Sequence, residues 1–309
     1  MNIENVNSEP FLNFHQFHEH INITIKILTA SLHNTIEVVS SSNDEKALGR
    51  LISKADPAWN MPPIWSFSGI PKSQIYGYVS EFGLVGAFSA LDDFFDGIEA
   101  EINRWNEKID EEKKLVPRED CDKSDEKTLN IFNKYNWDKR EIEKYSPLLK
   151  YFRLVRNCIA HRNSKSSSAL ADFSRSECLH SVFSENFKNK TITGLPKFNK
   201  EDKIIIDPKL AIFSSHILRC ISENVNNKLI KFLGEDGVIN MAAHHAFFKD
   251  QPAVIGTHKT AEAIFNFILT DRYRVTLDDN REACTKAKQL GIWKRCLSRF
   301  EAANRDQRS

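Results

Sequence analysis

An unbroken apolar stripe in the first half of the chain constrains its fold more than any other feature. Large apolar residues recur at steps of three and four: Leu84, Phe88, Leu91, Phe95, Ile98, Ile102, Trp105 and Ile109. This spacing places them on one face of an α-helix, because a helix completes a turn in about 3.6 residues. The stripe predicts a helix of roughly eight to ten turns, from about Gln74 to Lys113.

The rest of the chain carries further helical segments and few residues that interrupt them. Of 309 residues, 11 are glycine, 10 are proline and 21 are phenylalanine, which favours a mostly helical protein with an aromatic core. Helices are expected over 11–40, 125–145, 146–163 and 208–234, with two or three more beyond. Stretch 55–71 is expected to be a loop and 191–207 at most a small β-hairpin. These segments predict a helical domain over 1–235 and a helical C-terminal appendage over 236–309.

Charge and cysteine content limit the classes of protein that this chain can represent. The 43 Lys and Arg residues balance 42 Asp and Glu residues, a net charge of +1, which excludes a globally cationic coat for nucleic acid. A local basic site is still allowed. The 6 cysteines form no CxxC pair, so free thiols in a reducing compartment are expected. The first residues lack the pattern of a signal peptide, and the most apolar stretch, 82–91, is about half the length of a membrane span. We expect a cytoplasmic protein that does not enter a membrane.

Common catalytic and metal-binding motifs are absent or weak. The chain has no phosphate-binding GxxxxGK[ST] loop, no GxGxxG turn and no GxSxG elbow. The histidines of HQFHEH (15–20) have some metal-ligand spacing but no second pair of ligands, so ordinary helix histidines are favoured. Adjacent His244 and His245 would point in different directions on a helix. The acidic run 92–96 is most simply the solvated flank of the long helix. We therefore expect neither a metal nor another cofactor.

The segment 146–163 is the part of the sequence that indicates chemistry. On a helix, its predicted buried stripe contains Leu148, Phe152, Val155 and Ile159, with Tyr151 and Cys158 at the flank. The opposite polar sector contains Arg153, Arg156, Asn157 and His161. Between residues 144 and 171 there are no acidic residues, so this surface is locally positive although the whole chain is neutral.

These residue types fit the cleavage of a phosphodiester in RNA. Cleavage requires a base that removes the 2′-hydroxyl proton and an acid that protonates the leaving 5′-oxygen, and an imidazole that titrates near neutral pH can transfer both protons. An arginine can hold the phosphate and neutralise the charge that builds on its oxygens. A structural alternative is open at this point, since the dipole of any helix favours cations in its last turns.

Arg156, Asn157 and His161, within the run LVRNCIAHRN, resemble the signature of the HEPN superfamily. That signature is an arginine, four to six intervening residues and a histidine, commonly with a polar residue directly after the arginine. The resemblance covers about residues 15–235 in the order of elements, and only about ten residues at the level of the motif. It implies an all-helical up-and-down bundle, dimerised so that two copies of the motif face one composite cleft.

The resemblance also implies a function, because family members with both residues are typically metal-independent endoribonucleases that leave a cyclic phosphate. Many are toxins or antiviral effectors. It implies that Arg156 and His161 are catalytic and that Asn157 positions one of them. One toxin subgroup has a tyrosine two residues after the histidine that its antitoxin modifies; Asn163 stands there in this chain, so that regulation is not supported. Some members place an acidic residue of the long helix near the cleft, for which Asp92 is the candidate.

Three hypotheses follow. The leading one is a homodimeric endoribonuclease in which Arg153 and Arg162 contact flanking phosphates of the RNA, and which a protein partner inhibits or activates. The second is a non-catalytic HEPN-like module that binds nucleotide, RNA or protein through the same strip. The third is a structural helical protein that dimerises through its long helix.

Overall fold

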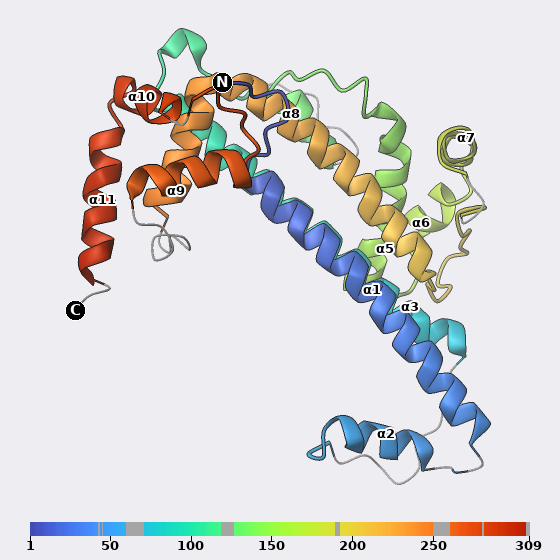
Figure 1. Ribbon diagram of the computed structural model, residues 1–309. Helices are drawn as coiled ribbons and strands as arrows, with labels where there is room; N and C mark the ends of the chain where they lie inside the picture. The colour runs from blue at the N-terminus through green and yellow to red at the C-terminus, as the bar shows by residue number, and fades with distance from the viewer. Residues whose placement is uncertain are drawn as a thin grey trace. The chain divides into compact units, whose positions relative to one another are not determined.

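A computed structural model describes residues 1–42, 44, 46–59, 71–118, 127–188, 192–249, 260–279 and 281–306 (Figure 1). Within these ranges the chain is mainly α-helical and contains no β-strand, only the isolated bridges Asn2–Thr276 and Lys165–Lys203. This confirms the all-α fold class. None of the helices described combines the length and the apolar character that a membrane span requires.

The helices differ greatly in length. They are α1 (Glu9–Ser41), α2 (Ala47–Ala55), α3 (Lys72–Asn106), α4 (Asn130–Lys134), α5 (Ser146–His161), α6 (Ser168–Phe173), α7 (Glu177–Asn186), α8 (Pro208–Phe247), α9 (Ala261–Phe267), α10 (Glu282–Gln289) and α11 (Trp293–Asp306). A π-helical turn, Ile268–Arg272, follows α9, and short 3-10 turns lie at Glu111–Lys113, Lys127–Leu129 and Glu143–Tyr145.

The chain forms two compact units, and neither is one continuous stretch of sequence. Unit 1 comprises Met1–Gln16, Leu91–Glu141 and Cys220–Ser309, and unit 2 comprises Phe17–Ala90 and Ile142–Arg219. The long helices α1, α3 and α8 each contribute residues to both units. The division after residue 235 that the sequence suggests lies in unit 1, next to the kink of α8 at Gly234.

In unit 2, α1 packs closely against α3 at two glycines. Gly86 faces the ring of Phe17, and Gly83 faces the side chain of Ile25, so side chains of α1 occupy the space that a Cβ atom would fill. The neighbouring core cluster joins the two helices to the start of α8 and consists of Ile21, Ile25, Val79 and Ala211. Contacts of this kind bury the apolar stripe of each helix against the other, which is why such a helix is stable as part of a packed pair and not alone in water.

In unit 1, the first residues of α1 pack against the second half of α3. Pro10 lies against Gly97, and the rings of Phe14 and Phe94 lie 5.6 Å apart. The carboxylate of Glu9 is buried, where it accepts two hydrogen bonds from Arg272, at 2.6 and 2.8 Å. A buried charge is stable only when it is paired in this way.

The helices predicted from apolar periodicity are largely present, but several of their ends differ from the prediction. Helix α3 stops at Asn106 rather than near Lys113, because the Asn106 side chain pairs with the backbone of Leu115 through two hydrogen bonds of 2.9 Å. The end expected near Gly234 is confirmed as a kink inside α8. The backbone of Gly234 is not helical, with φ of 59° and ψ of −170°, so α8 consists of one helical segment before this glycine and a second that runs to Phe247.

Other segments differ more. A helix is expected over 125–145; in the described part of this stretch, residues 127–145, the structure has only α4 and two 3-10 turns. The hairpin expected over 191–207 is absent from residues 192–207; within this stretch, residues 201–204 pair instead with the segment after α5. The last apolar stripe is split into α10 and α11 by Gly291, whose φ is 69°. Most of the loop expected over 55–71 lies outside the described residues.

Candidate functional site

Helix α5, in unit 2, carries the motif and is anchored by one fully buried face. Its core side chains are Leu148, Leu149, Tyr151, Phe152, Val155 and Cys158. The buried face is rotated relative to the prediction, since Tyr151 and Cys158 are core residues whereas Ile159 is only half-buried. The Tyr151 hydroxyl donates a hydrogen bond of 3.0 Å to the carbonyl of Pro196, which satisfies its one polar group. The helix begins at Ser146, with Pro147 in its first turn, and no side chain of the N-cap residue bonds to its first amides.

The end of α5 is fixed by an unusual turn. Asn163 and Ser164 have left-handed φ angles of 52° and 58°, which asparagine tolerates better than most residues. The amides of Arg162 and Ser164 both donate to the carbonyl of Cys158, at 3.0 and 3.2 Å. This turn ends the helix at His161.

The chain beyond this turn is held by the extended segment 201–204. Ile204 donates to Ser164, Glu201 donates to Ser166, and Ser166 donates to Asp202, through backbone hydrogen bonds of 2.8–2.9 Å. Ile204 is completely buried, so these bonds are shielded from water. The backbone that follows His161 is therefore well defined.

Arg156, Asn157 and His161 lie on the face of α5 that is not buried in the core. Arg156 is half-buried, and its Nη1 donates a 3.2 Å hydrogen bond to Oδ1 of Asn157. The Nε of Arg156 is buried and has no hydrogen-bond partner among the described residues. His161, the last residue of α5, is exposed. The arginine is thus oriented by Asn157 and keeps unused donors, while the imidazole is open to a ligand.

The two predicted flanking arginines have different surroundings. The guanidinium of Arg153 lies over the buried ring of Phe88, 5.0 Å from its centre, which is a cation–π contact. Arg162 is exposed and forms a 2.6 Å ion pair with Glu201. Exposed ion pairs of this kind contribute only about 0–1 kcal/mol, so a phosphate can compete for Arg162.

Glu81 is an acidic residue near the end of α5 that the sequence did not indicate. It lies on α3, where the buried residue Ser164 donates a hydrogen bond to its carboxylate. Burial raises the pKa of the Glu81 carboxyl, although the bond from Ser164 and the charge of Lys203 oppose the rise. Asp92, the acidic candidate from the sequence, is exposed and belongs to unit 1. No pattern in the sequence distinguishes Glu81, since its proximity to Ser164 depends on how α3 packs.

Of the histidines with metal-ligand spacing, His18 is held by two neighbouring polar side chains. Nδ1 of His18 lies 2.6 Å from Oγ of Ser215, and Asn22 donates a 3.2 Å hydrogen bond to Nε2 of the same ring. The rings of His244 and His245 meet edge to face, with their centres 5.1 Å apart and their planes at 89°. Across the described ranges, no group of three or more His, Cys, Asp and Glu side chains is arranged to hold a metal ion.

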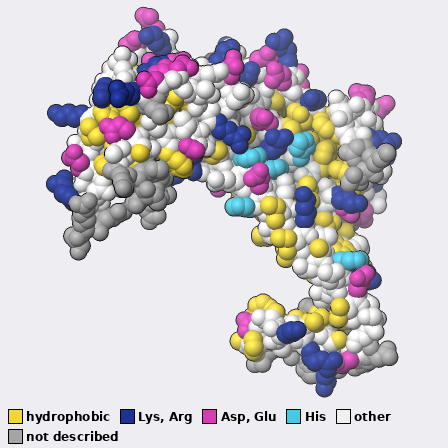
Figure 2. Space-filling view, in the orientation of Figure 1, with side chains coloured by type: hydrophobic (Ala, Val, Ile, Leu, Met, Phe, Trp, Pro, Cys, Tyr) yellow, Lys and Arg dark blue, Asp and Glu magenta, His cyan; other side chains and the backbone are white. Residues whose placement is uncertain are grey.

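Charge on the surface is mixed. On the face shown in Figure 2, Lys and Arg side chains are interspersed with Asp and Glu. This agrees with the nearly neutral composition and leaves no broad basic surface on that face.

Comparisons with known protein families, curated proteins and solved structures find no match to this chain.

Proposed function

We propose that this protein is a metal-independent endoribonuclease whose site is built on the exposed face of α5. The observation that carries the proposal is the arrangement of Arg156, Asn157 and His161 at the end of one anchored helix. Arg156 is oriented by Asn157 and keeps a buried, unpaired Nε, and His161 is exposed less than two turns away. This supports the HEPN resemblance of the motif.

In this mechanism Arg156 binds the non-bridging oxygens of the scissile phosphate and Asn157 keeps the guanidinium in place. His161 accepts the proton of the 2′-hydroxyl, whose oxygen attacks phosphorus. The bond from phosphorus to the 5′-oxygen breaks, and an imidazolium returns a proton to that oxygen. The products are a 2′,3′-cyclic phosphate and a 5′-hydroxyl, so no water, metal or cofactor is consumed. Arg153 and Arg162 hold the neighbouring phosphates.

We further propose that two copies associate so that their motifs share a cleft. Unit 2 exposes several large apolar side chains on α1 and α3, which supports an interface there: Ile23, Ile27, Tyr78 and Phe82 are 49–61% exposed. Exposed apolar residues in this number favour burial against a partner. A ribonuclease of this kind would act in the cytoplasm, as a toxin or an antiviral effector under the control of a partner protein.

The test is cleavage of end-labelled RNA by the full chain in the presence of EDTA. His161→Ala is expected to reduce the rate at least about 100-fold, since a positioned acid or base contributes roughly 10²–10⁴-fold. Arg156→Ala is expected to have a similar effect, and Asn157→Ala a loss of about tenfold, the effect of one lost hydrogen bond. All three variants should keep the circular dichroism and melting temperature of the parent protein.

His33→Ala and Arg50→Ala are the matched controls, because both residues are more than half exposed in unit 2 and lie on other helices. Unchanged cleavage by His161→Ala would refute the assignment. Loss of cleavage in EDTA would indicate a metal-dependent nuclease. If the parent protein binds RNA through Arg156 but never cleaves it, the non-catalytic binding module is the correct description.

A further inference from the structure

Unit 1 contains a pocket that the proposed ribonuclease does not use. Its volume is about 310 Å³, at the lower end of the range for small-ligand sites, which is roughly 300–1,000 Å³. It is lined by Arg104, Glu107, Lys108, Asn240, Ala243, His244, Phe248, Ile292 and Arg295. These residues come from the end of α3, the end of α8 and the start of α11, so the pocket exists only when three distant parts of the sequence are assembled.

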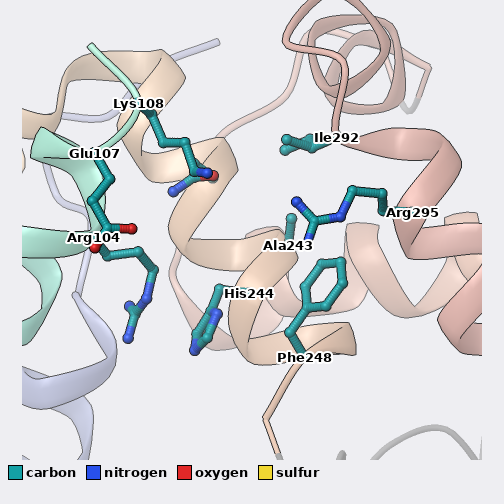
Figure 3. A pocket seen from close by; sticks show the side chains of 9 residues that line it. Arg104, Glu107, Lys108, Ala243, His244, Phe248, Ile292 and Arg295 are labelled. Atoms are coloured by element: carbon teal, nitrogen blue, oxygen red, sulfur yellow. The ribbon is translucent and has the colours of Figure 1, made fainter.

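More cationic than acidic side chains line this pocket. Figure 3 shows Lys108 and Arg295 extending toward one another from opposite sides, with Arg104 beside His244. Arg104 forms an ion pair with the buried Glu101, so its presence has a structural reason. Lys108 and Arg295 form no ion pair with the described residues, and Glu107 is the one acidic residue in the lining.

Helix α11 adds to the positive potential. Gly291 has a left-handed φ, and the next residue, Ile292, lines the pocket. Helix α11, of 14 residues, begins directly after Ile292. The first amides of a helix carry partial positive charge and donate readily to anions. Arg295 lies in this first turn, so its charge and the helix dipole favour the same kind of ligand.

The aromatic and apolar part of the pocket lies beside these cations. Phe248 follows α8, and its amide donates a 2.8 Å hydrogen bond to the carbonyl of His244. The guanidinium of Arg295 lies 5.3 Å from the centre of the Phe248 ring. The centre of the His244 ring lies 6.4 Å from the centre of the same Phe248 ring. With Ala243 and Ile292, Phe248 forms an apolar wall next to the cationic groups.

We propose that this pocket binds a mononucleotide, with the phosphate between Lys108 and Arg295 and the base against the wall formed by Ala243, Phe248 and Ile292. Arg104 and the ring N–H of His244 supply further donors to the phosphate oxygens. The ligand combines a compact anion with a flat apolar ring, which is the combination that the lining offers. This site is separate from the motif on α5 and does not depend on the ribonuclease proposal.

The test is calorimetric titration of the full chain with AMP, adenosine and inorganic phosphate. We expect AMP to bind more tightly than either of its parts. The double variant Lys108→Ala/Arg295→Ala should weaken AMP binding about tenfold or more, since each removes a charged hydrogen bond. Phe248→Ala should weaken binding of AMP but not of phosphate, and Glu107→Gln should strengthen both.

Lys294→Ala/Arg299→Ala is the matched control, because both residues are exposed on α11 and neither lines the pocket. It removes the same charges and should leave AMP binding unchanged. The proposal is overturned if AMP does not bind, if the control loses as much affinity as the pocket variant, or if phosphate binds as tightly as AMP. The melting temperature of each variant separates a lost site from a lost fold.

Discussion

Arg156 has more hydrogen-bond donors than its surroundings use. One Nη1 bond to Asn157 orients the guanidinium, while the buried Nε has no partner among the described residues. Burying a donor without a partner costs about 1–3 kcal/mol. A phosphate oxygen that accepts a hydrogen bond from this nitrogen removes the cost. The free energy recovered in this way should add to the affinity for phosphate. This nitrogen, more than the charge of the segment, distinguishes the exposed face of α5 as a candidate site.

At the residue scale, His244 predicts how stability depends on pH. Burial lowers the pKa of His244 to about 4, with Arg104 and His245 acting in the same direction, from its ordinary value of 6.5. In the unfolded chain the ring gains a proton below pH 6.5 that the folded protein does not accept until about pH 4. The free energy of unfolding should therefore fall as the pH falls through this window, and His244→Gln should flatten the fall.

Urea unfolding of the parent protein and of His244→Gln, between pH 7 and pH 4, measures this difference. His33→Gln is the control, since it removes a histidine that is 62% exposed. Equal pH dependence in the parent protein and in His244→Gln would contradict the prediction. Saturating AMP should raise the pKa of His244, because a bound phosphate favours the protonated ring.

At the scale of elements, glycines decide how closely helices approach. A Cβ atom at Gly97 would lie 2.9 Å from Cβ of Pro10, and the proline ring has no rotamer that moves it away. Gly97→Ala should therefore lower the free energy of unfolding by about 1–3 kcal/mol, the cost of overpacking. Thermal and urea unfolding measure the change.

Gly49→Ala is the opposite case on α2. Nothing lies within 4 Å of a Cβ atom at this position, so alanine brings only its better helix propensity. It should stabilise the protein by roughly 0.5–1 kcal/mol. If both variants changed stability in the same direction, close packing at Gly97 would not be the reason for a glycine there.

The helices themselves could be predicted from the sequence, while their ends and the contacts between them could not. The stripe from Leu84 to Trp105 specifies α3 because periodicity is local information. The end of α3 depends on the pairing of Asn106 with Leu115, and the missing hairpin depends on the pairing of 201–204 with 164–166. Such bonds follow from tertiary packing, which no local pattern reveals.

The same distinction applies to the two sites. Arg156, Asn157 and His161 lie within six consecutive residues of one helix, so their spacing was visible in the sequence. Glu81 approaches Ser164 only through the packing of α3, and the pocket in unit 1 joins residues as distant as Arg104 and Arg295. In the sequence, His244 stands out only as half of an adjacent pair, so no local pattern indicates the pocket.

At the scale of the whole molecule, the division into two units predicts what a truncated chain does. A fragment of residues 1–235 would lose Arg272 and Tyr273, which bind the buried carboxylate of Glu9, and the segment of α8 that follows the kink at Gly234. Removing the partner of a buried charge costs about 3–5 kcal/mol. We expect the fragment to lose the cooperative unfolding transition of unit 1 and to become prone to aggregation.

Circular dichroism and differential scanning calorimetry of the fragment and the full chain measure this loss. A soluble fragment with a cooperative transition would contradict the division into units and would restore residues 1–235 as an independent domain. Either result also shows whether ribonuclease variants can be studied without the last 74 residues, 236–309.

Unit 1 joins the first residues of the chain to its last third, which limits the order in which the protein can fold during synthesis. Glu9 and Arg272 are separated by 263 positions, and Asn2 bridges to Thr276. While a ribosome makes the chain, the first turns of α1 must remain without their partners until nearly the whole sequence has emerged. Closing so long a loop is slow compared with forming local helices. The N-terminal segment therefore gains its contacts with residues 272–276 only late in synthesis, and the pocket in unit 1 is complete only after α11 has emerged.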